Sequence, residues 1–302
     1  LITKIMKSLN RIFIAVVAVL LCVGCTQDGT SDNASQVSNQ QVSLSFFETS
    51  LQPLQEKQAL TRADESGTAL KNSPFTYLNI ALIPVNGQGK TIILQQSKSE
   101  VAENFGHVKL SVPIGEYHLV AVASKNAQVQ INSLTEIVFP DKVTDMGYMN
   151  MKIDVKSGNN SLNCALKRAV AKFMITDTGN RSADITNLVF HLSGNCSNKL
   201  NPTTGLAADI SDVNPVVAAG SSNRYVAFVF LSSAEEKNIK VGVELKNAAG
   251  TTLKTLNFEN VHMKTNYVTE YKGALYNLSG MADFTFSDGD FIDSGTGKTF
   301  GE

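Results

Sequence analysis

The sequence contains no tryptophan, and its other aromatic residues are 15 phenylalanines and seven tyrosines among 302 residues. Sites that bind sugars usually stack the sugar rings on exposed aromatic side chains. Many of the phenylalanines here fall in strand-like apolar runs, which predict burial. The shortage of aromatic residues elsewhere argues against a sugar-binding surface as the main purpose of the chain.

An excess of charge of one sign is also lacking. Lysine and arginine number 26, aspartate and glutamate 27, and the formal net charge is −1. Binding to nucleic-acid phosphates requires an excess of basic residues, so no nucleic-acid partner is expected. Cysteine is scarce, because apart from two near the start only Cys164 and Cys196 occur. These two could form a disulfide outside the cytoplasm, but we favour two buried free thiols.

Recognisable catalytic and metal-binding arrangements are missing. The histidines have no second histidine, cysteine or carboxylate at the spacing of a metal site, and no Gly-x-Ser-x-Gly nucleophile motif occurs. The segment "NGQGKT", residues 86–91, looks like the end of a phosphate loop, but Pro84 stands where that motif requires glycine. We therefore expect no catalytic residue, no metal and no cofactor, in a protein that is not an enzyme.

One long apolar run is present, near the N-terminus. Basic residues precede residues 12–23, a run of about a dozen residues that has the length of a secretory signal and is too short for a membrane-spanning helix. The run ends at Cys25, as in bacterial lipoprotein signals, which are cut before a cysteine whose sulfur then receives a diacylglyceryl group. The sequence predicts a signal peptide over residues 1–24, with Met6 as the true start, and lipidation of Cys25, with palmitate among the acyl chains. An ordinary secretion signal with a chance cysteine is the alternative.

A polar stretch follows the cysteine and surrounds one predicted strand. Residues 26–41 are rich in Ser, Asn, Gln and Asp and are expected to form a flexible tether. In "VSLSFFETSL", residues 42–51, apolar and polar residues alternate, which predicts a strand. The residues after it are polar again and contain Arg62. We assign residues 25–62 to a lipidated tether and prosegment with one strand.

From residue 75 onward, short apolar runs alternate with turn residues. "FTYLNIALIPV", "TIILQQ", "YMNMKIDVKSG" and "NIKVGVELK" predict strands, and "VPIGEYHLVAVAS" predicts a hairpin turn at Pro-Ile-Gly. Short strands about ten residues apart are typical of β-sandwiches or barrels. We place a junction in the polar segment 155–164 and expect two all-β domains, residues 63–160 and 161–302.

Several segments, taken in order, resemble the fimbrillin superfamily of Bacteroidales, the subunits of lipoprotein-derived (type V) pili. They are the signal ending at Cys25, the prosegment strand "QVSLSFFET" followed by "LTRADES", the opening strand "TYLNIALIPV", the hairpin "VPIGEYHLVAVAS", the entry into a second domain "ALKRAVAKFMITDT", and the late strand "VHMKTNYVTEYKGALYNL". Each motif is degenerate by itself. The resemblance lies in their order along nearly the whole chain.

The resemblance implies two tandem transthyretin-like β-sandwich domains, and export through the periplasm as a lipoprotein to the outer membrane and cell surface. It implies cleavage by an arginine-specific protease, for which Arg62 is the matching residue and Ala63 the new N-terminus; Lys57 is also available. It further implies polymerisation with other subunits of a fimbrium by strand exchange, in the service of cell adhesion. Stalk or accessory subunit and anchor both stay open as roles.

Strand exchange agrees with the physics of an open sheet. A sandwich that loses one strand exposes unpaired backbone groups and an apolar groove, which an extended segment of another chain can fill. The prosegment side chains expected to fill such a groove are Val42, Leu44, Phe46 and Phe47. A possible donor is a strand near residues 281–287 that carries Phe284 and Phe286, and the same piece could equally be the last strand of the second domain.

A second function class also stays open. The chain could be an outer-membrane surface lipoprotein that does not polymerise and whose β-sandwiches bind a glycan or a protein partner. Proteolysis by an arginine-specific protease separates the two, because only a pilus subunit is expected to form multimers afterwards.

Overall fold

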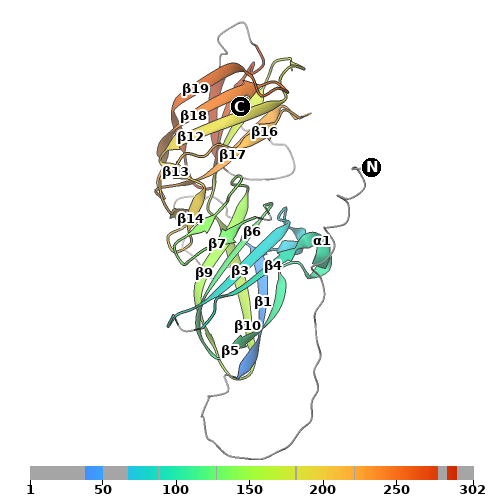
Figure 1. Ribbon diagram of the computed structural model, residues 1–302, viewed down its shortest axis with the longest axis vertical. Helices are drawn as coiled ribbons and strands as arrows, with labels where there is room; N and C mark the ends of the chain where they lie inside the picture. Colours follow the sequence, from blue (N-terminus) through green and yellow to red (C-terminus); the bar gives the residue numbers. More distant parts are fainter. Residues whose placement is uncertain are drawn as a thin grey trace, which may run out of the picture. The chain divides into compact units, whose positions relative to one another are not determined.

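The computed structural model describes residues 38–49, residues 67–277 except 88, 127, 181 and 221, and the backbone of residues 284–290 (Figure 1). Regular structure in these residues is almost entirely β, so the all-β prediction is confirmed. The helical pieces are a single short α-helix and two 3-10 turns: η1 (Leu70–Asn72), α1 (Lys98–Val101) and η2 (Ala102–Asn104). No helix within the described ranges has the length and apolar character needed to cross a membrane.

The first sheet has eight strands in the order β2-β1-β10-β9-β6-β3-β4, with β5 also paired to β1. Its strands are β1 (Asn39–Glu48), β2 (Thr68–Ala69), β3 (Tyr77–Pro84), β4 (Ile92–Ser97), β5 (His107–Pro113), β6 (Gly115–Ser124), β9 (Met146–Val155) and β10 (Asn160–Arg168). The sheet folds into two layers, because β10 pairs with β9 only through Lys167 and Arg168. One layer holds β5, β2, β1 and β10, and the other holds β9, β6, β3 and β4.

The first core lies between these two layers. Alternate residues of β1 and β5 point into it, which is the consequence of the two-residue period of a strand. They meet Leu78, Ile80 and Leu82 of β3, all at most 1% exposed. The alternation that predicted strands in the sequence therefore marks the buried face of each layer.

The expected hairpin in "VPIGEYHLVAVAS" is not a hairpin. β5 pairs with β1, whereas β6 pairs with β3 and β9, so the chain passes from one layer to the other at Pro113–Gly115. Gly115 has a φ of +153°, and Ile114 at the bend is 47% exposed. Turn residues in the sequence mark the change of direction but carry no information about which strand becomes the partner.

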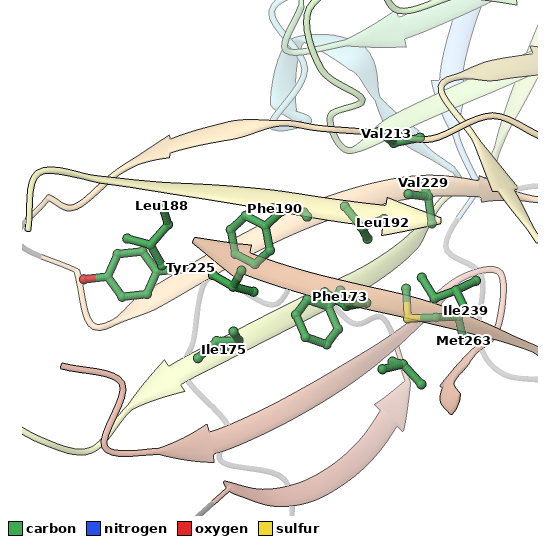
Figure 2. Close-up of a cluster of buried hydrophobic side chains, with 14 of the residues drawn as sticks. Phe173, Ile175, Leu188, Phe190, Leu192, Val213, Tyr225, Val229, Ile239 and Met263 are labelled. Carbon is green, nitrogen blue, oxygen red and sulfur yellow. The ribbon is translucent and has the colours of Figure 1, made fainter. Parts of the chain in front are cut away.

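The second sandwich has a sheet in the order β13-β17-β11-β20-β21 facing a sheet in the order β16-β12-β18-β19. Its strands are β11 (Ala171–Asp177), β12 (Asn187–Gly194), β13 (Cys196–Ser197), β16 (Val216–Ala218), β17 (Arg224–Leu231), β18 (Lys237–Lys246), β19 (Thr252–Met263), β20 (Tyr267–Gly273) and β21 (Phe284–Asp290). Figure 2 shows the core, where Phe173 of β11 meets Phe190 of β12 edge to face, with ring centroids 6.1 Å apart.

A small third sheet, in the order β15-β14-β8-β7, combines strands from both halves of the sequence. Its strands are β7 (Gln130–Ile131), β8 (Ile137–Val138), β14 (Lys199–Asn201) and β15 (Leu206–Ala207). The strand β10 pairs in the first sheet, although the expected boundary at residue 160 assigned it to the second domain. Sheet membership therefore changes between Arg168 and Ala171, because the polar segment near residue 158 is only the turn between β9 and β10.

Candidate functional site around strand β1

Strand β1 is the middle strand of its layer, with neighbours on both sides. On one side, Val42–Glu48 run parallel to β10, opposite residues 160–166. On the other side, Asn39–Ser45 run antiparallel to β5, and Phe47 and Glu48 pair with β2. In Figure 1 the blue arrow of β1 lies among these strands. The predicted prosegment strand is thus a structural part of the first sandwich.

The side chains of β1 are sorted onto its two faces. Val42, Leu44 and Phe46 are 0%, 1% and 3% exposed and belong to the first core. Phe47 lies on the other face and is half-buried against Gly67, where a Cβ atom would come within 2.0 Å of the ring. Full burial of a large apolar side chain contributes about 1.5–3 kcal/mol, so the three core residues together stabilise the docked strand by on the order of 5 kcal/mol.

The neighbours of β1 depend on it for their backbone hydrogen bonds. Among the described strands, β5 has no ladder partner other than β1, and β10 otherwise pairs only through Lys167 and Arg168. Loss of β1 would leave facing rows of unpaired N–H and C=O groups on β5 and β10. It would also expose the apolar side chains of the first core that β1 covers. Such rows pair readily with an extended segment of another chain.

The C-terminal end of β1 is fixed by a charged cluster. Arg168 of β10 donates from Nε to Oδ1 of Asp145 at 2.7 Å and from Nη2 to Oδ2 at 3.2 Å. The same Nη2 donates to Oε1 of Glu48 at 3.3 Å, and Nη1 donates to Oδ1 of Asn266 at 3.4 Å. The Arg168 side chain is 11% exposed, Glu48 19% and Asp145 4%. Low exposure strengthens such contacts relative to surface ion pairs, which contribute little.

The chain between β1 and β2 starts and ends at adjacent points of the sheet. It leaves β1 after Thr49, whose N–H donates to the Leu166 carbonyl at 3.1 Å, and it returns at Gly67. Glu48 then pairs with Thr68. The predicted processing residues Arg62 and Ala63 fall between these points and lie outside the described residues, as does the predicted lipidation residue Cys25.

The predicted donor piece forms β21 at the edge of the second sheet. Its one ladder neighbour in the described structure is β20, with Phe284 opposite Gly273 and Phe286 opposite Tyr271. The structure does not bring this strand to β1. An edge strand is paired along one side, whereas β1 is paired along both sides.

Cys164 and Cys196 are free and buried, as expected. Cys164 lies in the first core directly opposite Phe46, and Cys196 lies in the second core. Burial raises the pKa of the Cys164 thiol to about 12. Burial, assisted by the negative charge of Asp212, raises the pKa of the Cys196 thiol to about 12 as well. Both thiols are therefore protonated and unreactive in the folded chain.

Sequence reasoning missed two residues of this site, Cys164 as the partner of Phe46 and Arg168 as the partner of Glu48. The separation along the chain is more than 100 residues in each case, so no local pattern marks the pairing. The only sequence signal is an arginine at the end of an alternating strand. No group of three or more His, Cys, Asp or Glu side chains suited to a metal occurs in the part of the chain that is described.

Comparisons with known proteins find similar architectures. No protein-family pattern matches the sequence, and no curated protein sequence matches it. A protein described as a candidate adhesin from Bacteroides ovatus is 8% identical, over 82% of this chain and 93% of its own, with a TM-score of 0.46. A candidate cell adhesion protein from Bacteroides uniformis is 12% identical, over 83% of this chain and 99% of its own, with a TM-score of 0.45.

The fimbrial anchor protein Mfa2 from Porphyromonas gingivalis is 10% identical, over 83% of this chain and 98% of its own, with a TM-score of 0.41. These neighbours are described as candidate adhesion proteins and as a fimbrial anchor protein, and each of their TM-scores is below 0.5. Identities this low do not by themselves assign the chain to a family.

Proposed function

We propose that this chain is a structural subunit of a bacterial surface fimbrium that serves cell adhesion and assembles by proteolysis-triggered strand exchange. The observation that carries the proposal is the position of β1 between β5 and β10, whose described ladders it completes. A strand in that position is needed to complete the sheet. Its covalent link to the rest of the sandwich runs through residues 50–66.

Cleavage after Arg62 is the proposed trigger. Before cleavage, β1 and β2 belong to one continuous chain, and dissociation of β1 is opposed by rebinding at high effective concentration. After cleavage, β1 is held by non-covalent contacts alone, among them its ladders, its core side chains and the Glu48–Arg168 contact. A competing strand can then replace it permanently, because the released prosegment diffuses away.

The replacing strand comes, in this proposal, from another subunit, and the piece near residues 281–287 with Phe284 and Phe286 is this chain's own donor. Its position at a sheet edge supports this, since leaving the edge breaks one ladder and docking beside β5 and β10 forms two. Lipidation of Cys25 would carry the precursor through the periplasm to the outer membrane. Stalk subunits then lose the lipid together with the prosegment, whereas an anchor keeps both.

The test uses the lipoprotein extracted from membranes in detergent and treated with an arginine-specific protease. We expect a new N-terminus at Ala63 and a ladder of multimers on size-exclusion chromatography. Arg62→Ala should abolish both, and Lys57→Ala, the matched control, should leave both intact. A protein that is cut after Arg62, loses its prosegment and stays monomeric at high concentration would contradict the proposal.

A second candidate function is a surface lipoprotein that does not polymerise and binds an acidic glycan or protein. A hollow of about 410 Å³ favours it. Its lining includes Phe228, the Arg168-paired carboxylate of Asp145, and three basic residues that form no ion pair within the described structure, Lys125, Lys142 and Arg224. Retention of the uncleaved protein on an acidic polysaccharide column, lost in Lys142→Glu and unaffected by Arg62→Ala, would support this alternative.

A further inference from the structure

At the end of β1, an acidic side chain of that strand meets a largely buried partner of opposite charge. Glu48, the last residue of β1, accepts a hydrogen bond from Nη2 of Arg168 at 3.3 Å. Arg168 is itself held in place by the two-point contact with Asp145, which is 4% exposed. Because the Asp145 contact does not involve β1, the guanidinium would stay at the end of the groove if β1 left.

A groove that accepts an exchanged strand has to define the register of that strand. Shifting a strand by one residue turns its apolar face outward, so alternation excludes that error. Shifting it by two residues restores the alternation and lets the backbone ladders form again. Backbone pairing and the alternation of faces therefore do not separate registers that differ by two, and the particular side chains at each position have to do so.

We propose that Arg168, positioned by Asp145, is a register latch that selects an incoming strand with an acidic residue at the position of Glu48. The occupant is residues 282–288 of a second copy of this chain, with Asp288 in the place of Glu48. This inference rests on the proposed strand exchange and adds to it the chemistry by which the correct strand and register are recognised.

The sequence of the second segment matches the first position by position. Leu44-Ser45-Phe46-Phe47-Glu48 corresponds to Phe284-Thr285-Phe286-Ser287-Asp288. Both segments carry a large apolar residue, a hydroxyl residue, a phenylalanine, a variable residue and an acid. The hydroxyl position has a partner too, since Ser45 Oγ lies 3.2 Å from Nδ1 of His107 on β5.

Only one register satisfies both the core and the latch. With Asp288 at the position of Glu48, Phe286 lies opposite Cys164 where Phe46 lies now. A shift of two residues in one direction places Phe286 beside the Arg168–Asp145 pair and removes the carboxylate. A shift in the other direction places Asp288 in the core opposite Cys164, where an unpaired carboxylate is strongly unfavourable.

The test measures peptide binding to the lipoprotein after cleavage at Arg62, by fluorescence polarisation of labelled peptides. The peptides are residues 39–49, residues 281–290, and the latter with Asp288→Asn or Asp290→Asn. Asp288→Asn keeps an acceptor oxygen but removes the negative charge that strengthens the hydrogen bond to Arg168, and loss of that charge at a mostly buried site weakens binding about tenfold. We expect that loss for Asp288→Asn and less than about twofold for Asp290→Asn, which removes the same charge two residues further on.

A second readout reports the register directly. Peptides 281–290 with an activated cysteine, introduced as Phe286→Cys or Phe284→Cys, are allowed to form a mixed disulfide with Cys164. The first should react and the second should not, and adding Asp288→Asn should reduce this selectivity. Equal reaction from both positions would overturn the single register.

The remaining outcomes separate the latch from the proposed function. Equal affinity of the Asp288→Asn and unaltered peptides overturns the latch while strand exchange stands. Binding of peptide 39–49 without binding of peptide 281–290 overturns the assigned occupant. Failure of every peptide to bind overturns the strand exchange on which the inference rests, and the inference with it.

Discussion

Phe46 of β1 lies directly opposite Cys164 of β10, and both side chains are buried in the first core, at 3% and 0% exposure. A large ring therefore rests on a small side chain of a strand that follows it by more than 100 residues. This pair joins β1 to β10, and it makes Cys164 a reporter of whether β1 is in place.

The ring of Phe46 should be the strongest single apolar contact of β1. Phe46→Ala is expected to lower the free energy of unfolding by about 3–5 kcal/mol, because it removes a fully buried ring and leaves a cavity. Phe47→Ala is the matched control and should cost clearly less, since Phe47 is only half-buried on the other face. Denaturant unfolding followed by circular dichroism measures both, and equal losses would mean that β1 is not seated with Phe46 inward.

Gly106 should be intolerant of a side chain because of its closeness to β1. Its φ is +92°, its carbonyl accepts from the Phe46 N–H at 2.8 Å, and a Cβ atom would lie 2.8 Å from Cβ of Leu70 and 3.2 Å from the Phe46 carbonyl oxygen. Gly158 has a similar φ of +105° with open space around it. Gly106→Ala should therefore lower the melting temperature more than Gly158→Ala, which carries only the backbone strain of about 1–2 kcal/mol.

Stability should fall at high pH because of the two buried thiols. In the unfolded chain each thiol ionises near its ordinary pKa of 9.0, whereas in the folded chain the pKa is raised to about 12. Between these values the unfolded state releases protons that the folded state retains, so rising pH favours unfolding. The denaturation midpoint should decline from pH 9 toward 12 more steeply in the unaltered protein than in a Cys164→Ala, Cys196→Ala double variant. Parallel curves would contradict burial of the thiols.

The predicted lipid attachment requires Cys25 and does not require Cys22, which lies three residues before it. Cys25→Ala is expected to remove the protein from the outer-membrane fraction, because no acyl chain would then hold it there. Cys22→Ala, the control, should leave fractionation unchanged. A Cys25→Ala protein that still sediments with outer membranes and resists extraction with salt would show that another attachment holds it.

Local patterns in the sequence predicted the strands better than their partners. The alternation of Val42, Leu44 and Phe46 predicted a strand with one apolar face, and the same is true of β18, where Ile239, Val241, Val243 and Leu245 are at most 1% exposed. Alternation reflects the two-residue period of a strand, so it defines a buried face wherever the strand pairs.

Pairing itself depends on residues far apart in the chain. The parallel contact of β1 with β10, and the passage between layers at Pro113–Gly115, have no local pattern, which is why a hairpin was expected there. The charged cluster was missed for the same reason, because Glu48, Asp145 and Asn266 converge on Arg168 from different strands and turns. The expected boundary at residue 160 was placed in a polar segment that forms the turn between β9 and β10.

Thiol alkylation before and after cleavage tests most directly whether β1 is a replaceable strand. The lipoprotein is treated at pH 8 with a maleimide, and labelling of Cys164 and Cys196 is compared by mass spectrometry in the intact chain, in cleaved monomers that have lost residues up to 62, and in multimers. The account predicts that Cys164 reacts only in the cleaved monomers and is protected again in multimers, while Cys196 stays protected throughout. Cleaved monomers in which Cys164 remains as protected as Cys196 would contradict it.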